Sequence, residues 1–489
     1  MTTFSRRGFL AASAAALAIS QFPRTGSAQQ QALDLRATSR TLDIDGKAAT
    51  VWGLAGPSGQ GLVLDPGQRF MVNLTNELPT PTLIHWHGQI PPNEQDGVPD
   101  MPMPMLAPGQ MRGYDFVAAP GTHWMHAHIP LQEMRLLAAP LIVRSPQDIT
   151  GDRQEVTMFL HDFAFKSPEE VMEEITGGHS SGGHASMGHG EMSGNRMPQM
   201  DQSAMPGMDH GSMPMAGMEM DLNDYNWDAY LANDRTLSDP EVVRVERGGR
   251  VLLRVINASA ATVFWVDTGA VEARLVAVDG HAVQPVKGSR FGIAMGQRLD
   301  MEIDLSGSGV WPMLALREGA RERTGLILAT AGADIARVGS TADEEAAAFD
   351  TDLSQELQLV ARDPLPPRAL QRSHMVMLGG GMQPYRWTIN GRTWGEHVPV
   401  TARTGERVEI MFHNMSMMGH PMHLHGHVFQ VVEINGKRID GARRDTVFVP
   451  PMAMVTVALD AGEAARWMLH CHHMPHLETG MMTEFAVAA

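Results

Sequence analysis

The residues near the C-terminus combine a thiol, imidazoles and a thioether at close spacing. His470-Cys471-His472 is followed by His476 and Met481, and Cys471 is the single cysteine of the 489-residue chain. One cysteine cannot form an intramolecular disulfide, so its value lies in its chemistry. Cys, His and Met are ligands of a blue-copper electron-transfer site, which needs one more His. Because successive side chains of a strand point to opposite faces, Cys471 would point away from both flanking histidines.

Four His-x-His pairs occur along the chain, and a strand would present both rings of a pair to one side. A core or surface histidine usually explains one such pair, but four pairs and the cysteine form a specific signal. Eight imidazoles fit a cluster of three copper ions, in which two ions take three rings each and one takes two. The residues left for a single copper elsewhere are His420, Cys471, His476 and Met481. The pairs are His85 and His87, His126 and His128, His423 and His425, and His470 and His472.

These motifs resemble those of the multicopper oxidases, and within them the bacterial copper efflux and copper-resistance oxidases. HWHG, HAH, HPMHLHGH and HCHHMPHLETGMM occur in the order of the family, near the two ends of the chain. The less specific segments GQRLD near residue 300 and WTING near residue 390 also look like family segments. The resemblance covers most of the chain.

The resemblance implies four copper ions and a ligand set for each. The type 2 copper would take His85 and His423. The paired type 3 coppers would take His87, His126 and His472 on one side and His128, His425 and His470 on the other. The type 1 copper would take His420, Cys471 and His476, with Met481 as axial ligand.

Length and composition predict a loop-rich, all-β protein of about three domains. The chain contains 49 Gly and 31 Pro between short β-type runs such as RFMVNLTN and RVLLRVINA. The resemblance implies three cupredoxin-like Greek-key β-sandwich domains, with the three-copper cluster between the first and the last. We expect these domains at residues 38–148, 152–335 and 371–489, with a linker at 336–370.

The first 28 residues are predicted to be a twin-arginine signal peptide. Ser5-Arg6-Arg7-Gly8-Phe9-Leu10 is followed by an apolar stretch to Ile19 that is too short to span a membrane. A general secretory signal with a chance Arg pair is the alternative. The motif predicts that the twin-arginine export machinery is a partner and that the protein is periplasmic.

The charge balance excludes some partners. Lys and Arg number 38 against 55 Asp and Glu, a formal net charge of −17, which argues against non-specific nucleic-acid binding. No other run approaches membrane-spanning length, so we expect no stable membrane insertion.

Methionine is enriched in one low-complexity segment, which we predict to be a disordered insert of the second domain at residues 177–220. Residues 179–220 hold ten of the 37 Met and four His, with almost no residue suited to a core. Thioethers are soft ligands that favour Cu(I). A linker with no metal role is the alternative. Copper efflux oxidases carry their Met-rich insert in the last domain, so the position here differs.

Two acidic residues are candidates for moving protons. Asp96, in NEQDGVP, occupies a place where the family has an acid that assists the type 2 copper, although a turn before Gly97 would also explain it. The family often has Glu directly after the last type 1 His. That place is Leu477 here, and Glu478 follows on what would be the other face of a strand.

Met418 is a candidate ligand of substrate copper. It lies two residues before His420, where copper efflux oxidases place a Met of their Cu(I) site, but the Asp of that site is Ser416 here. Loop packing of Met418 is the alternative. The histidines without partner spacing are expected to be structural: His123, His281, His374, His397, His413, His427 and His473.

The leading functional hypothesis is oxidation of Cu(I) for copper tolerance, coupled to reduction of O2 to water. Electrons would enter at the type 1 copper and pass from Cys471 through His470 and His472 to the three-copper cluster. A thioether axial ligand lowers the potential, which suits Cu(I) better than difficult phenols. The alternatives are a general laccase that acts on phenols and aromatic amines, and a copper-sequestering protein that uses the Met-rich segment.

Overall fold

The computed structural model describes residues 31–177 and 222–489 of the chain. The predicted signal peptide and almost all of the predicted Met/His-rich insert lie outside the described residues. In the described part, the strands form six sheets, two for each of three consecutive units, so the all-β prediction is confirmed. Among the helices of these residues, none has the length and apolar character to cross a membrane.

The first unit has two sheets, with the strand orders β3-β2-β1-β5-β7 and β4-β9-β8-β6. β5 alternates buried and half-buried side chains, the period of a strand with one face on a core. β1 pairs in parallel with β5 from Leu33 onward, so the sheet begins before residue 38, our expected start. The elements are β1 (Leu33–Ile44), β2 (Lys47–Gly56), β3 (Gly59–Gln60), β4 (Leu62–Leu64), β5 (Phe70–Asn76), β6 (Ile84–His87), η1 (Asn93–Gln95), β7 (Met111–Phe116), β8 (Gly121–Ala127), α2 (Pro130–Glu133), β9 (Ala138–Val143) and α3 (Pro146–Thr150).

The second unit also has two sheets, with the orders β11-β10-β13-β18-β15-β16 and β12-β20-β19-β14-β17. Its α4 begins at a Ser167 capping box and buries Val171, Met172 and Ile175 against the core of the third unit. The elements are β10 (Gln154–Phe163), α4 (Pro168–Thr176), β11 (Ala229–Ala232), β12 (Val242–Arg244), β13 (Arg250–Asn257), β14 (Phe264–Asp267), β15 (Ala273–Val278), β16 (His281–Gly288), β17 (Arg290–Ile293), β18 (Arg298–Asp304), β19 (Val310–Arg317) and β20 (Arg323–Ala329).

The third unit has the sheet orders β22-β21-β24-β30-β26-β27, with β28 paired to β26, and β23-β32-β31-β25-β29. The connection before it carries only η2 (Glu356–Gln358) and bridges back to the second unit, for example Glu318 with Ala346. The elements are β21 (Arg372–Met382), β22 (Tyr385–Ile389), η3 (Trp394–Glu396), β23 (Val400–Arg403), β24 (Arg407–Asn414), β25 (His420–Leu424), β26 (Phe429–Ile434), β27 (Lys437–Arg438), β28 (Arg443–Arg444), β29 (Thr446–Val449), β30 (Met454–Asp460), β31 (Arg466–Cys471), α5 (Met474–Glu478) and β32 (Met482–Ala488).

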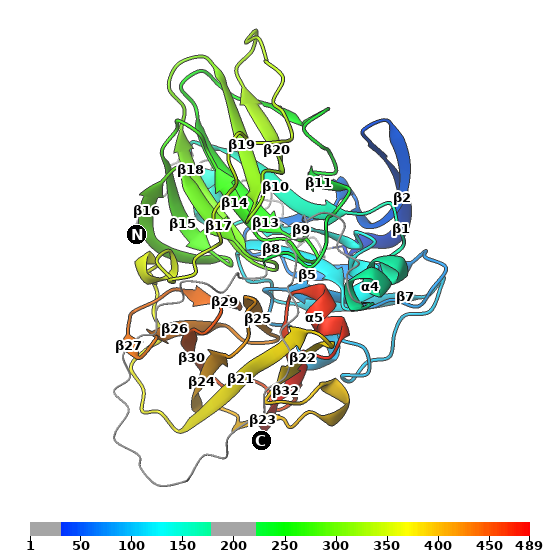
Figure 1. Cartoon of the computed structure of the whole chain (residues 1–489), viewed down its shortest axis with the longest axis vertical. Coiled ribbons are helices and arrows are strands. Elements are labelled where there is room, and N and C mark those ends of the chain that lie inside the picture. Colours follow the sequence, from blue (N-terminus) through cyan, green and yellow to red (C-terminus); the bar gives the residue numbers. More distant parts are fainter. Residues whose placement is uncertain (1–30, 178–221) are drawn as a thin grey trace, which may run out of the picture.

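Each unit encloses one hydrophobic core between the inner faces of its two sheets. In the first unit, Leu35 and Phe70 of one sheet and Trp86 and Leu141 of the other belong to one buried cluster. Figure 1 shows the second unit (green) above the third (yellow to red), with the first unit (blue to cyan) behind and to the right. The short α5 lies close to α2 of the first unit and at the centre of this arrangement.

A buried arginine of the second unit joins all three units. Arg298 is fully buried and donates to both carboxylate oxygens of Asp445 in the third unit, at 2.7 and 2.5 Å. Its Nε donates to the carbonyl of Thr122 in the first unit at 3.1 Å. Close by, Arg444 of the third unit donates to Asp279 of the second at 3.0 Å. Such pairs hold the three units in one arrangement because a buried charge separated from its partner is costly.

We expect Arg298→Met to lower the stability of the copper-free protein by about 3–5 kcal/mol, because Asp445 would keep a buried charge with no cation beside it. The measurement is the shift in thermal unfolding of the copper-free chain. Lys287→Met is the control, because the Lys287–Glu272 pair is 68% and 61% exposed and should hardly matter. Equal unfolding temperatures for the two variants would contradict the role given to Arg298.

Candidate metal centre

The eight paired histidines lie on neighbouring strands of the first and third units or directly after the ends of these strands. β6 and β8 pair with His85 opposite His126, and β25 and β31 pair with His423 opposite His470. The residue between the rings of each pair points the other way. For example, Trp86 belongs to the core of the first unit and Cys471 to that of the third. All eight rings are buried, so the strands present them to the space between the two units.

The rings gather into the groups that the family resemblance implied. Two groups of three rings have all their ligand nitrogens within 4.8 Å of one another: His87, His126 and His472, and His128, His425 and His470. In the second group, the Nε2 atom of His470 lies 3.1 Å from His425 Nε2 and 3.4 Å from His128 Nε2. His85 Nε2 and His423 Nε2 face each other at 3.4 Å, and His87 also lies within reach of this pair.

The donor set fits metal ions. Burial and the neighbouring rings lower the pKa values of His126 and His470 well below the usual value, so these two rings are neutral at physiological pH. A neutral imidazole is the form that binds metal. The buried nitrogens His126 Nε2, His472 Nδ1 and His472 Nε2 have no hydrogen-bond partner within the described residues. Buried polar atoms normally have partners, and a shared cation would satisfy these.

Asp96 connects two of the groups. It is buried, its Oδ2 accepts from His425 Nδ1 at 2.8 Å, and its backbone carbonyl accepts from His85 Nδ1 at 2.8 Å. Both rings therefore turn their Nε2 atoms toward the shared space. This is the outer-shell arrangement that orients metal-binding histidines, and it places the predicted acidic residue at the cluster.

Two further carboxylates at the cluster escaped the sequence analysis. Glu133 of α2 is buried, and its Oε2 lies 2.7 Å from His126 Nδ1. Burial and the carboxylate of Asp162 raise the pKa of Glu133 well above its usual range.

Asp445 accepts from His87 Nε2 at 3.0 Å. Burial opposes the charge of Asp445, but Arg298 and His87 outweigh it and hold its pKa well below the usual range. Neither Glu133 nor Asp445 lies in a sequence motif that predicts a position at the cluster.

A second group lies on the other face of β31. His420 Nδ1 and His476 Nδ1 are 3.2 Å apart, and Cys471 Sγ is 3.7 Å from each. All three side chains are fully buried. Met481 is buried in the same core, and its backbone N–H and C=O bond to His476 and Cys471. Burial raises the pKa of the thiol, so metal binding at this site would release its proton.

The loop before His420 and a carboxylate of the second unit complete this site. Ser416 Oγ lies 2.7 Å from His420 Nε2, and Met418 is buried beside it. Asp224 is buried, contacts the hydroxyl of Tyr385, and places Oδ2 3.5 Å from His476 Nε2. Asp224 comes from another unit, more than 200 residues from His476, so no spacing in the sequence predicts its place here.

The structure places Glu478, the other acidic candidate of the sequence, at an exposed position. It is the last residue of α5, its side chain is on the exposed side, and among the described residues no hydrogen bond or ion pair links it to the histidine groups. α5 follows directly after β31, so its residues no longer alternate as in a strand. In place of Glu478, α2 brings Glu133 to the cluster.

Comparison with known proteins identifies the class. The multicopper oxidase family matches residues 36–148, 195–333 and 367–489, and the chain belongs to this family. It therefore uses copper as cofactor and is an oxidoreductase. The chain is 31% identical to the multicopper oxidase MmcO of Mycobacterium tuberculosis over 85% of this chain and 79% of that protein.

Other relatives extend the comparison. Copper resistance protein A of Escherichia coli is 24% identical, covering 95% of this chain and 94% of that protein. Laccase-2 of Botryotinia fuckeliana is also 24% identical, covering 95% and 82%. Among solved structures, the multicopper oxidase McoA of Aquifex aeolicus superposes with a TM-score of 0.67 at 22% identity, covering 94% of this chain and 96% of that chain. This likeness confirms the cupredoxin-like fold.

We expect Glu133→Ala to weaken copper binding at the cluster by about 10- to 100-fold. The Nδ1 atom of His126 is hydrogen-bonded to the carbonyl of Ala127, and the substitution would remove the carboxyl group that contacts the same nitrogen. Glu133→Gln, which keeps the shape of the side chain and an oxygen at this position, should recover most of this loss. The measurement is the copper retained per chain after dialysis against a competing chelator. Glu169→Ala, at an exposed position of α4, is the control. Full retention in Glu133→Ala would contradict the orienting role.

Proposed function

We propose that this protein is a periplasmic cuprous oxidase that serves copper tolerance and is exported by the twin-arginine machinery. It would couple the oxidation of four Cu(I) to four Cu(II) to the reduction of one O2, with four protons, to two waters. Membership in the multicopper oxidase family and the similarity to a copper resistance protein support this proposal. The choice of Cu(I) as substrate rests on the full burial of His420, Cys471 and His476. We call this group, with Met481, the single-copper site.

We further propose that the chain holds four copper ions. His420, Cys471 and His476, with Met481 as axial ligand, would hold the type 1 ion. His85 and His423 would hold the type 2 ion, and the two groups of three rings would hold the type 3 pair. When bound, these ions supply one-electron acceptance from substrate and four-electron reduction of O2.

The protein's own residues connect and orient the two sites. Cys471 lies between His470 and His472 in the chain, so one peptide unit on each side joins the thiol to a ring of the cluster. Asp96 and Glu133 are the carboxyl groups in contact with His425 and His126, and they are our candidates for holding protons at those Nδ1 atoms. In this proposal, Asp96 keeps its predicted role in moving protons at the cluster. Glu133 is proposed as the second acid for this role, which the sequence had suggested for Glu478.

The surroundings of the single-copper site favour a small, soft substrate. His420, Cys471 and His476 are each 0% exposed, which leaves no edge of a ligand ring for an organic molecule to touch. The adjacent cavity, lined by Met418, His473 and Glu318, measures about 20 Å³. Such a space holds about one water molecule and no aromatic ring. Met418 lines this cavity, and thioethers favour Cu(I).

A general laccase is the second candidate, since Laccase-2 of Botryotinia fuckeliana is among the relatives. Phenols would then be the substrates. Copper sequestration by the Met-rich segment stays a prediction of the sequence, because that segment lies outside the described residues.

We expect Cys471→Ser to abolish the blue colour and nearly all oxidase activity, while the copper of the histidine cluster stays bound. A hydroxyl cannot replace a thiolate as a soft ligand, and the colour arises from the copper–thiolate bond. Visible absorption, copper content and oxygen uptake of the purified variant check this. A blue variant would overturn the assignment of Cys471.

The substrate is tested by steady-state oxygen uptake with Cu(I) and, separately, with a small phenol. We expect rapid uptake with Cu(I) and slow uptake with the phenol, because the buried site admits an ion but not a ring. Each assay is run with and without added Cu(II), and Cys471→Ser provides the blank for oxidation of Cu(I) without enzyme. Fast phenol oxidation together with negligible Cu(I) oxidation would establish the laccase instead.

A further inference from the structure

The outer face of one sheet of the third unit carries a group of methionines around a histidine. Met375 and Met377 lie on β21, Met411 and His413 on β24, and Met454 on β30. These three strands are neighbours in the sheet. We call these five residues the thioether face.

The register of the strands brings the five side chains together. Met377 is paired with His413, and His413 with Met454, so these three form one row across the sheet. Met375 is paired with Met411 in the next row, two residues along both strands. Directly paired residues have Cβ atoms about 4.5–5.5 Å apart on the same face. The long, flexible thioether arms of both rows can therefore meet around the His413 ring.

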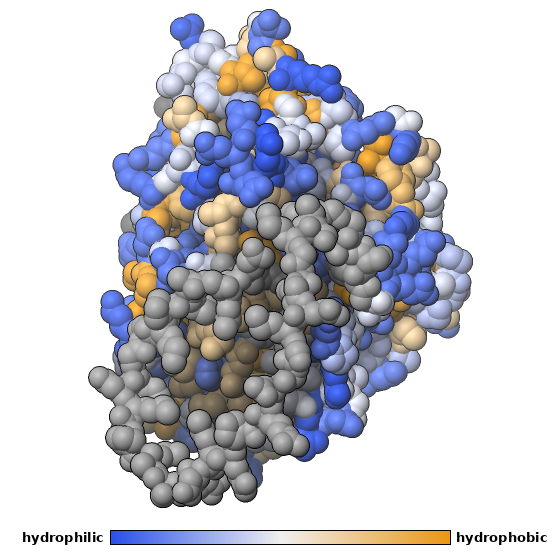
Figure 2. Space-filling view, viewed as in Figure 1, coloured by the Kyte–Doolittle hydropathy of each residue, from blue (hydrophilic) through white to orange (hydrophobic). Residues whose placement is uncertain are grey.

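Packing does not explain these methionines. Their neighbours in sequence, such as Val376 and Phe412, fill the core, whereas Met375 is 59% and Met377 41% exposed. Six methionines are exposed among the described residues, and four of them lie on this sheet or at its end: Met375, Met377, Met415 and Met452. In Figure 2, hydrophobic residues are visible on the third unit, in the lower part of the view. Methionine normally fills gaps in a hydrophobic core, but the outer face of this sheet does not border a core.

The histidine in the middle is available as a ligand. His413 is half-buried, and no hydrogen bond or ion pair to another described residue engages its ring. The His413 ring lies beside three methionine side chains. Together they offer three soft sulfur ligands and one imidazole nitrogen of intermediate softness. Such a set suits a monovalent soft ion and is poor for Mg²⁺ or Ca²⁺, which require oxygen ligands.

We propose that the thioether face is a binding site for Cu(I), formed by Met375, Met377, Met411 and Met454 with His413. The site lies apart from the buried histidine groups and from the cavity beside Met418. It would take the ion from solution, because its ligands are on the surface.

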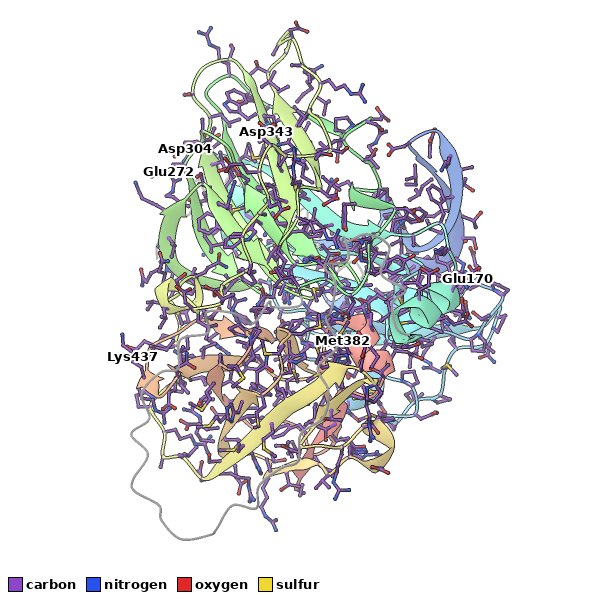
Figure 3. The ribbon with its side chains drawn as sticks, viewed as in Figure 1. Glu170, Glu272, Asp304, Asp343, Met382 and Lys437 are labelled. Atoms are coloured by element: carbon purple, nitrogen blue, oxygen red, sulfur yellow. The ribbon has the colours of Figure 1, made fainter. Side chains whose placement is uncertain are left out.

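The face leads toward the single-copper site. β24 continues into the loop 415–419, in which Met418 is buried and Ser416 contacts His420. The amide of Asn414 fixes that loop by donating to the carbonyl of Met418 at 2.7 Å. In Figure 3, β21 crosses the front of the third unit and ends at Met382, beside α5, which carries His476. A Cu(I) ion on this face is thus held near the place where its electron would be accepted, a role that rests on the proposed function.

The test replaces Met375, Met377, Met411 and Met454 together by Leu in the full, copper-loaded chain. Leucine keeps the volume and apolar character of methionine and removes only the sulfur, so the fold should be unaffected. Silver(I) serves as the probe, because it is a soft monovalent ion that the enzyme cannot oxidise. The control is a Leu variant of the exposed methionines Met105 and Met111, in the first unit. Both variants keep residues 178–221 unchanged.

We expect the fourfold variant to bind about one Ag(I) fewer than the wild-type protein in titrations against a competing chelator, while the control binds as wild type. Unfolding temperature and blue colour should stay unchanged. With Cu(I) as substrate, KM should rise several-fold at constant kcat, and kinetics with a phenol should not change.

Unchanged Ag(I) binding by the fourfold variant would overturn the site, and would indicate an apolar docking face, for which leucine serves as well as methionine. The two proposals fail separately. If the wild-type protein does not oxidise Cu(I) but still binds the additional Ag(I), the proposed function fails and the site stands. If Cu(I) oxidation is confirmed and Ag(I) binding is equal, only the site fails.

Discussion

Eight imidazole rings buried together between two domains are the constraint on which this structure depends. Burial and the neighbouring rings hold the pKa values of His126 and His470 low, so these rings stay neutral. The group also leaves nitrogens such as His126 Nε2 and His472 Nε2 without partners in the described residues. Carboxylates behind the rings set their orientation, so that the free nitrogens converge. Metal ions can bind the ring nitrogens that have no hydrogen-bond partner in the protein. Metal binding then contributes to the stability of the assembled domains.

The second domain has no paired histidines, yet the site depends on it. Arg298 is the cation for Asp445, which in turn accepts from His87. Asp224 of the same domain lies behind His476, in the group that also holds Cys471 and His420. The middle domain thus supplies the charges that fix ligands contributed by its neighbours, and the buried ion pairs that do so also determine how the three domains meet.

Much of the site could be predicted because its ligands are rare residues at strand spacing. Alternation along β31 separates Cys471 from His470, and His472 follows directly after the strand; this separation is expected from the sequence once the strand is assumed. The carboxylates could not be found in this way. Glu133, Asp224 and Asp445 are ordinary acidic residues, and nothing local in the chain marks them. Glu478 was considered because it is close in sequence to His476, but the helix α5 places it on the exposed side.

By itself, the sequence indicated the all-β class, because two-residue periodicity is a local property of the chain. The resemblance of its histidine and cysteine motifs to a known family implied the family and the grouping of the histidines. The tertiary structure alone decided which acids stand behind which rings, since Asp445 and His87 are 358 residues apart. It also decided that Met375, Met411 and His413 share one exposed face, because strand register joins residues that have no common motif. Contacts of this kind depend on how sheets pair and domains pack, which no single segment encodes.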